Sequence, residues 1–121
     1  MLYKEDMNAN KAVQTFLVIG ALAFAVRAAH AAEAKELWDK NCASCHGKDG
    51  RGDTKMGKKV DVKDYTDPKF QADYKEDKAI KTIKEGIMDK GKERMKPYAD
   101  KFTEEEIKAL VAYIRTFKKS P

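Results

Sequence analysis

Both cysteines of this 121-residue chain lie in one pentapeptide, Cys42-Ala-Ser-Cys-His46, together with one of its two histidines. If the pentapeptide forms a helical turn, Cys42 and Cys45 occupy positions i and i+3, and their sulfur atoms project from the same face. The other histidine is His30. Because nitrogen and sulfur ligands are scarce elsewhere, this pentapeptide is where we expect a metal or a cofactor.

Cys-x-x-Cys-His is the attachment sequence of c-type haem. Cys42 and Cys45 would form thioethers with vinyl groups of two neighbouring pyrrole rings. His46 would then be held beneath the ring plane, where one imidazole nitrogen can bind the iron. The sequence therefore predicts one covalently attached haem c, with iron as its metal.

Three other interpretations of the pentapeptide stay open. A redox dithiol normally opens a helix after a strand of a βαβ unit, and no such strand is visible in the sequence. A structural disulfide could form in an oxidising compartment before any cofactor is attached. A zinc site would have at most three ligands here, because the chain has no second Cys-x-x-Cys and no histidine near by.

Residues 1–31 differ in composition from the rest of the chain. Basic residues precede an uncharged apolar run at 16–26 (FLVIGALAFAV), and Ala29-His-Ala31 follows it. A basic start, a short apolar stretch and small residues at −3 and −1 are typical of a secretory signal peptide. The run is too short to be a retained membrane anchor. As a helix it would be only about 16 Å long, whereas the hydrocarbon core of a bilayer is roughly 30 Å thick. We expect export to the periplasm and cleavage after about Ala31.

Cleavage there would leave residues 32–121 as a single domain. Although 37% of the whole chain is charged, apolar residues recur at helical spacing at 32–41, from about 77 to 87, and at 104–117. Thr103 and Glu106 predict a capping box at the start of the last helix. No alternating run is long enough for a sheet. The sequence predicts an all-α domain of three or more helices, whose long loops need a large apolar group to surround.

The second axial ligand of the iron is sought among three methionines, because a histidine removed with the signal peptide cannot serve. Met56 is only ten residues from His46 and so is too near to reach round the ring easily. Met88 extends the apolar stripe of the second helix, which favours a place in the core. Met95 lies in an expected loop beside a proline that stiffens the chain. These observations favour Met95.

The domain resembles the class I cytochromes c, which are small single-haem electron carriers. The resemblance covers residues 32–121 and rests on three motifs: Cys42-Ala-Ser-Cys-His46-Gly47, Met95-Lys-Pro-Tyr98 and Leu110-Val-Ala-Tyr113-Ile114-Arg115. It implies a cytochrome c fold wrapped round one haem, with His46 and Met95 as iron ligands. It also implies that the first and last helices cross at Ala34, Trp38, Leu110 and Tyr113.

Two positions depart from the family pattern. Lys96 stands between Met95 and Pro97, where the family usually has proline directly after the methionine. Many members have a proline shortly after the haem histidine, and its carbonyl orients the imidazole; no proline occurs between His46 and Asp67. The hydrogen-bond partner of His46, which would tune the reduction potential, is therefore unassigned by the sequence.

The resemblance implies a soluble periplasmic electron carrier that transfers one electron at a time and is not an enzyme. Two thioethers and two axial ligands would leave no open position on the iron. The alternative is an open-site haem protein, a small-ligand sensor or a weak peroxidase, in which Met95 is not coordinated. Lys96 and the charged stretch Lys92-Glu93-Arg94 are the grounds for that alternative.

Positive charge is concentrated in the two segments that hold the expected iron ligands. Residues 46–60 contain five basic and two acidic residues, as do residues 90–101, whereas residues 61–89 contain six basic and eight acidic residues. We therefore expect a basic rim near an exposed haem edge that steers acidic redox partners. The plainer interpretation is a solvated surface of a lysine-rich protein. We expect a monomer without stable membrane insertion, and no nucleic-acid binding, because no recognition motif is present.

Overall fold

The computed structural model describes residues 6–119, with side chains from residue 19 onward. The chain divides into two compact units, Met1–Ala32 and Glu33–Pro121. Helix α1 (Asp6–Asn41) continues across that boundary. The side chains described from residue 19 to residue 33 are all exposed, so they add nothing to the core.

The expected signal peptide lies within the first unit, and its residues 1–5 are outside the described residues. Cleavage after Ala31 stays a prediction. Within the described part of the chain, no helix is both long enough and apolar enough to cross a membrane.

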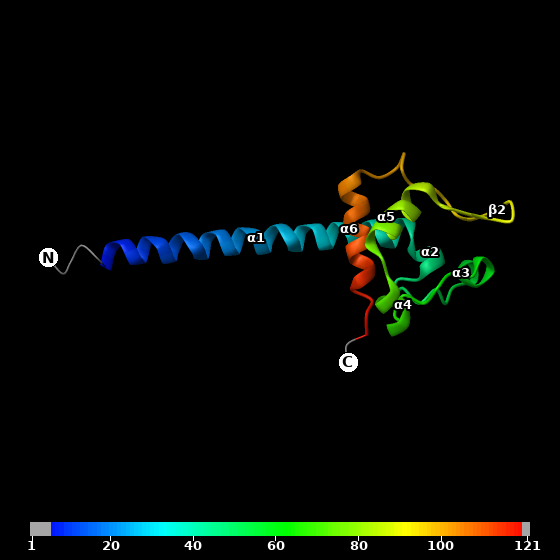
Figure 1. Cartoon of the computed structure of the whole chain (residues 1–121), viewed down its shortest axis with the longest axis horizontal. Helices are drawn as coiled ribbons and strands as arrows, with labels where there is room; N and C mark the ends of the chain where they lie inside the picture. The colour runs from blue at the N-terminus through cyan, green and yellow to red at the C-terminus, as the bar shows by residue number, and fades with distance from the viewer. Residues whose placement is uncertain (1–5, 120–121) are drawn as a thin grey trace. The chain divides into compact units, whose positions relative to one another are not determined.

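The second unit is mainly helical, as the sequence predicts (Figure 1). Its longer helices, α5 and α6, pack side by side. After α1 its elements are α2 (Ala43–His46), α3 (Lys55–Val60), α4 (Pro68–Asp73), α5 (Glu76–Glu85), β1 (Ile87–Asp89), β2 (Lys92–Met95) and α6 (Glu104–Arg115).

The last helix begins at the predicted capping box. The Glu106 N–H donates to Thr103 Oγ1 (3.2 Å), and the Thr103 N–H donates to Glu106 Oε2 (2.7 Å). These bonds satisfy donors that the first helical turn would leave unpaired. The helix then buries one apolar stripe: Ile107, Leu110, Val111 and Ile114.

The first and last helices meet at the residues that the resemblance implies. Ala34, Trp38 and Leu110 are each no more than 2% exposed. The Trp38 ring centroid lies 5.7 Å from that of Tyr113 and 5.0 Å from that of Phe117. Trp38 and Leu110 belong to the buried core of the unit, and the partly buried rings of Tyr113 and Phe117 pack against that core.

Two short helices lie in segments where the sequence predicts only loop. Thr54 caps α3 by accepting the Gly57 N–H (2.8 Å), and Asp67 caps α4 by accepting the Lys69 N–H (2.8 Å). Pro68 stands at the first position of α4, where its missing N–H costs nothing. The capping residues were visible in the sequence, but helices of six residues are too short for a clear apolar period.

The hairpin of β1 and β2 is the main difference from the all-helical expectation. The strands pair antiparallel, with Ile87 opposite Met95, and a two-residue turn joins them. In that turn Lys90 and Gly91 have φ of 50° and 75°, which suits a tight hairpin. Lysine seldom adopts positive φ, so Lys90-Gly91 is not one of the usual hairpin pairs and the sequence does not predict the turn.

The hairpin corrects two expectations about methionines. Met95 ends a strand and does not lie in a loop. The core position expected for Met88 is wrong, because its side chain is 65% exposed. Helix α5 ends at Gly86, whose φ is 71°, so the helical stripe does not extend as far as Met88.

Candidate haem site

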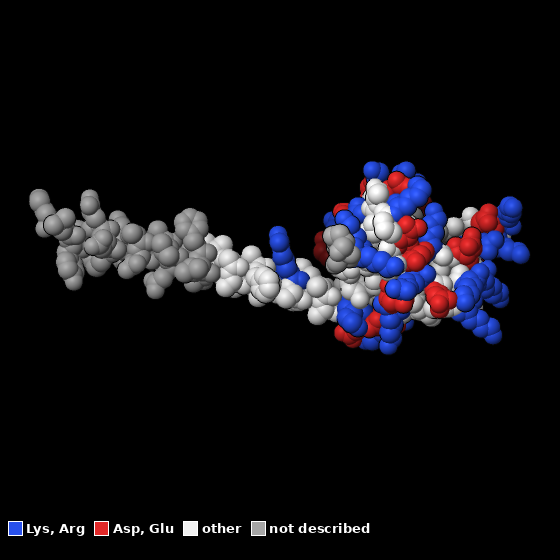
Figure 2. All heavy atoms as spheres, turned by 90° about the horizontal axis from the view of Figure 1, so that it is seen from below, with Lys and Arg blue, Asp and Glu red and all other residues white. Residues whose placement is uncertain are grey.

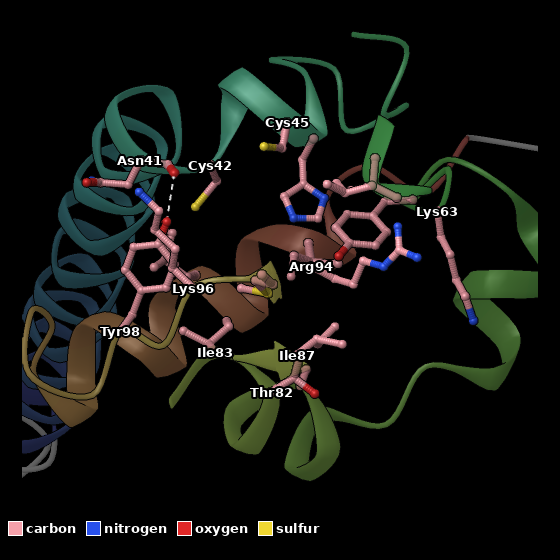
Figure 3. Close-up of a pocket in the computed structure, with 18 of the residues that line it drawn as sticks. Asn41, Cys42, Cys45, Lys63, Thr82, Ile83, Ile87, Arg94, Lys96 and Tyr98 are labelled. Carbon is pink, nitrogen blue, oxygen red and sulfur yellow. Dashed lines mark hydrogen bonds between the residues drawn. The ribbon is translucent and has the colours of Figure 1, made fainter. Parts of the chain in front are cut away.

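The pentapeptide forms one helical turn where α1 leads into α2. The His46 N–H donates to Cys42 O (2.9 Å), and the Gly47 N–H donates to Ala43 O (2.8 Å). In Figure 3 the Cys42 and Cys45 side chains face a common space, with Ile83 and the hairpin opposite. The expected projection of both sulfur atoms from one face is therefore present.

Neighbouring segments hold this turn by hydrogen bonds to its carbonyl groups. Trp38 Nε1–H donates to Gly47 O (2.9 Å), and the Gly52 N–H donates to His46 O (2.8 Å). The Thr54 hydroxyl donates to Cys45 O (2.7 Å). The capping residue of α3 thus also fixes the backbone at the second cysteine, a link that the sequence did not indicate.

A cavity of about 1010 Å³ opens beside the turn. All four predicted site residues line it: Cys42, Cys45, His46 and Met95. Its volume is at the upper end for small-molecule sites. Many of the other lining side chains are apolar or aromatic: Val60, Val62, Tyr65, Phe70, Ile83, Ile87, Phe102, Leu110 and Ile114. The site suits a large, mostly apolar ligand.

His46 is held in its neutral form. Burial lowers the pKa of its imidazole to about 4, because the charged form would lose its hydration. A neutral imidazole is the form that binds a metal. Its Nδ1 is buried and has no hydrogen-bond partner, so Nε2 is the nitrogen left to face the cavity.

The surroundings of the cysteines argue against a redox dithiol and against a zinc site. Burial, and secondarily the charge of Cys45, raises the pKa of the Cys42 thiol to about 11, whereas redox dithiols depend on a lowered pKa. The motif follows a helix and not a strand. Among the described residues, no cluster of three or more His, Cys, Asp or Glu side chains could hold a metal ion on its own.

Met95 is placed by the close approach of two backbone segments. It is half-buried and packs against the core cluster. A Cβ atom at Gly86 would collide with Met95 O and would lie 2.8 Å from Pro97 N, so only glycine fits there. Met56 also lines the cavity but is 45% exposed, and Met88 is absent from its lining. Met95 is thus the best-held thioether at the cavity.

Two tyrosine hydroxyls near the cavity donate hydrogen bonds to backbone carbonyl groups of the protein. Tyr74 donates to Val111 O (3.0 Å), and Tyr98 donates to Asn41 O (3.2 Å), the bond drawn in Figure 3. Both bonds tie cavity-lining residues to helix backbone, so they stiffen its walls.

Comparison with known proteins decides the family. The family model for cytochrome c matches residues 31–118. This chain belongs to the cytochrome c family. None of the curated proteins compared with this cytochrome matches it significantly.

Solved structures of c-type cytochromes are similar to this chain, which is consistent with the family assignment. The cytochrome is similar to the KustC0563 c-type cytochrome, with 34% sequence identity and a TM-score of 0.62. The match covers 71% of this chain and 98% of that one. A point mutant of the same protein matches with 35% identity and a TM-score of 0.63, covering 71% and 99% of the two chains.

The residues at the cavity fit the cofactor of the family. As a cytochrome c the protein carries covalently attached haem c and acts in haem-based electron transfer. The cavity supplies two thiols on one helical turn, a neutral buried imidazole and apolar walls. The predicted cofactor is therefore confirmed at the level of the family.

Proposed function

We propose that this cytochrome is a soluble periplasmic electron carrier in which His46 and Met95 are the axial ligands of the haem iron. One observation carries the proposal: both side chains line the same cavity as Cys42 and Cys45, although Met95 is far away in sequence. When bound, the haem supplies a one-electron change between ferric and ferrous iron.

Each of the four residues has a distinct role in this proposal. Cys42 and Cys45, on one helical turn, would hold the ring through thioether bonds. The imidazole of His46 and the thioether of Met95 would be the two ligands of the iron. A thioether ligand supports a higher reduction potential than a second imidazole does.

The walls of the cavity explain why electron transfer is favoured over catalysis. If His46 and Met95 both bind the iron, no position would be left for oxygen or peroxide. Ile83, Leu110 and Ile114 keep water away from the ring, and the close packing limits the reorganisation that accompanies a change of charge. We therefore propose a carrier that alters no substrate.

The charges around the cavity support acidic redox partners. Its lining contains seven basic residues and three acidic ones: Lys40, Lys63, Lys75, Lys78, Arg94, Lys96 and Lys101 against Asp61, Asp73 and Glu93. Figure 2 shows basic side chains gathered at the end of the second unit that carries α3 and the hairpin. Such a field speeds encounter with an acidic protein.

Salt dependence tests the partner proposal. We expect the rate of electron exchange with an acidic redox protein to fall steeply as salt is raised, because salt screens exposed charges. A neutral small-molecule reductant is the control and should react at a rate that salt leaves unchanged. An acidic partner whose rate is equally insensitive to salt would contradict the steering role.

Absorption spectra of the purified protein and of Met95→Ala test the iron ligands. We expect a low-spin c-type spectrum with the weak long-wavelength methionine–iron band when oxidised. The Met95→Ala variant should lose that band, bind carbon monoxide when reduced and have a lower potential, while Met56→Ala, the matched control, should keep the band. A wild-type protein that is high-spin and binds carbon monoxide would favour the open-site alternative.

Export is tested by the mass of the protein recovered from the periplasm. The family is usually exported, and the small residues at 29 and 31 support cleavage there. We expect an N-terminus at Ala32 and haem attached in the mature chain. Full-length protein in the membrane fraction would show that the apolar run at 16–26 is retained as an anchor.

A further inference from the structure

The iron-facing histidine lacks the support that such ligands usually have. A histidine bound to a metal almost always donates its second ring N–H to a carbonyl, a carboxylate or water, and this bond sets the orientation of the ring. In the described part of the chain Nδ1 of His46 is buried and has no carbonyl or carboxylate partner. Something else must therefore set the plane of the imidazole.

Tyr65 lies against that imidazole as a parallel ring. The centroids of the His46 and Tyr65 rings are 5.0 Å apart, and their planes differ by 21°. The nearest other ring, that of Trp38, is 5.5 Å away and tilted by 40°. Turning the imidazole about its Cβ–Cγ bond would break the parallel contact with Tyr65.

The Tyr65 ring is itself held from several sides. Phe70 stacks on it with a centroid distance of 4.6 Å. The backbone N–H of Tyr65 donates to Gly50 O (2.8 Å), and the Tyr65 carbonyl accepts from Gln71 Nε2 (2.7 Å). Gln71 is only 3% exposed and also donates to Ile114 O (3.0 Å) in α6. The ring is thus a fixed surface and not a mobile neighbour.

We propose that Tyr65 is the positioning residue of the haem histidine: its stacked ring sets the plane of the His46 imidazole in place of a hydrogen bond at Nδ1. This inference rests on the proposed role of His46 as an iron ligand. The ring also keeps water from reaching Nδ1, so the imidazole stays a weaker electron donor than a hydrogen-bonded one.

The wild-type protein provides a first test that needs no variant. In the reduced, diamagnetic protein we expect nuclear Overhauser effects between the ring protons of Tyr65 and those of His46. Absence of these effects in a protein whose His46 signals carry the shifts of an iron-bound imidazole would overturn the inference. Absence of those shifts would instead contradict the proposed iron ligand.

Two substitutions of Tyr65 distinguish the contribution of its ring from that of its hydroxyl. In oxidised Tyr65→Leu we expect a changed order of the haem methyl proton shifts, which follow the ligand plane, and a lower reduction potential, because water can reach Nδ1. Tyr65→Phe keeps the stack and should retain the wild-type shifts and potential. If Tyr65→Phe behaves like Tyr65→Leu, the hydroxyl matters and the inference is wrong.

Tyr113→Leu is the matched control for loss of a packed ring. Tyr113 also contacts Trp38, at 5.7 Å between centroids, but it does not line the cavity. We expect this variant to be less stable yet to keep the wild-type order of methyl shifts. If it changes the shifts as much as Tyr65→Leu does, general loosening of the core explains the effect and the inference fails.

Discussion

At the scale of single residues, Trp38 connects the core to the haem turn. It is 2% exposed and lies between the rings of His46, Tyr113 and Phe117. Its indole N–H donates to Gly47 O (2.9 Å), directly after the proposed iron ligand. One side chain therefore fills the helix crossing and also holds the end of the pentapeptide.

Trp38→Phe should destabilise the haem-loaded protein. The change removes the indole N–H and leaves a buried carbonyl without that partner, which costs about 1–3 kcal/mol, and the smaller ring adds a packing loss. Denaturant unfolding of the haem-loaded variant and of the wild type measures the difference. An unfolding free energy equal to that of the wild type would show that the indole bond contributes nothing.

Tyr74 should make the protein less stable at alkaline pH. Burial raises the pKa of its hydroxyl above the usual value of 10.0. Above about pH 10 the unfolded chain therefore loses a proton that the folded protein keeps, so the free energy of unfolding falls as pH rises.

Tyr74→Phe tests this dependence. The variant should be somewhat less stable near neutral pH, because the bond to Val111 O is lost, but its stability should decline less between about pH 8 and about pH 11. Part of the decline should remain, since Tyr65, Tyr98 and Tyr113 also have raised pKa values. A decline as steep as that of the wild type would contradict the assignment to Tyr74.

At the scale of elements, the hairpin of β1 and β2 carries Met95 to the cavity. Helix α5 ends at Gly86, and the chain returns along β2 so that Met95 O and Pro97 N approach Gly86 closely. Beyond the strand, the Tyr98 N–H donates to Ile83 O (2.9 Å). The end of α5 and the end of β2 together fix the position of Met95 at the cavity.

Gly86→Ala should disturb this arrangement, with Gly91→Ala as its control. Both glycines have positive φ, 71° and 75°, which alanine seldom adopts, so alanine is strained at each by about 1–3 kcal/mol. At Gly91 the new Cβ meets no atom within 4 Å, whereas at Gly86 it collides with the backbone beside Met95. We expect the methionine–iron band to weaken in Gly86→Ala and to persist in Gly91→Ala. Equal bands in both variants would contradict the role given to Gly86.

At the scale of the whole molecule, the second unit is built around the cavity. Its small core is formed mainly by α6, Trp38 and the aromatic residues near them, while a cavity of about 1010 Å³ separates α2 and α3 from α5 and the hairpin. Chains of this size commonly depend on a cofactor for part of their stability.

The haem-free protein should therefore lose its fixed tertiary structure. We expect Cys42→Ala/Cys45→Ala, purified without haem, to keep helical circular dichroism in part but to lose the near-ultraviolet signal and the cooperative thermal transition. The haem-loaded wild type is the reference. A cooperative transition at the wild-type temperature in the haem-free variant would show that the polypeptide folds without the group.

Local signals in the sequence were enough for the family, the cofactor and the longer helices. Cys42, Cys45 and His46 are neighbours along the chain, so their spacing alone places them on one turn, and the capping box at Thr103 and Glu106 acts within a single turn. Such features depend on short-range geometry, which adjacent residues determine.

Tertiary packing decided what the spacing of residues could not. The sequence favours Met95 as the ligand but places Met88 in the core, whereas the positive φ of Gly86 ends α5, which leaves Met88 exposed and returns Met95 to the cavity. The stack of Tyr65 on His46 likewise joins segments that no helical or strand period relates. These contacts depend on where the backbone turns and which segments then meet, and that is set by packing of the folded chain as a whole.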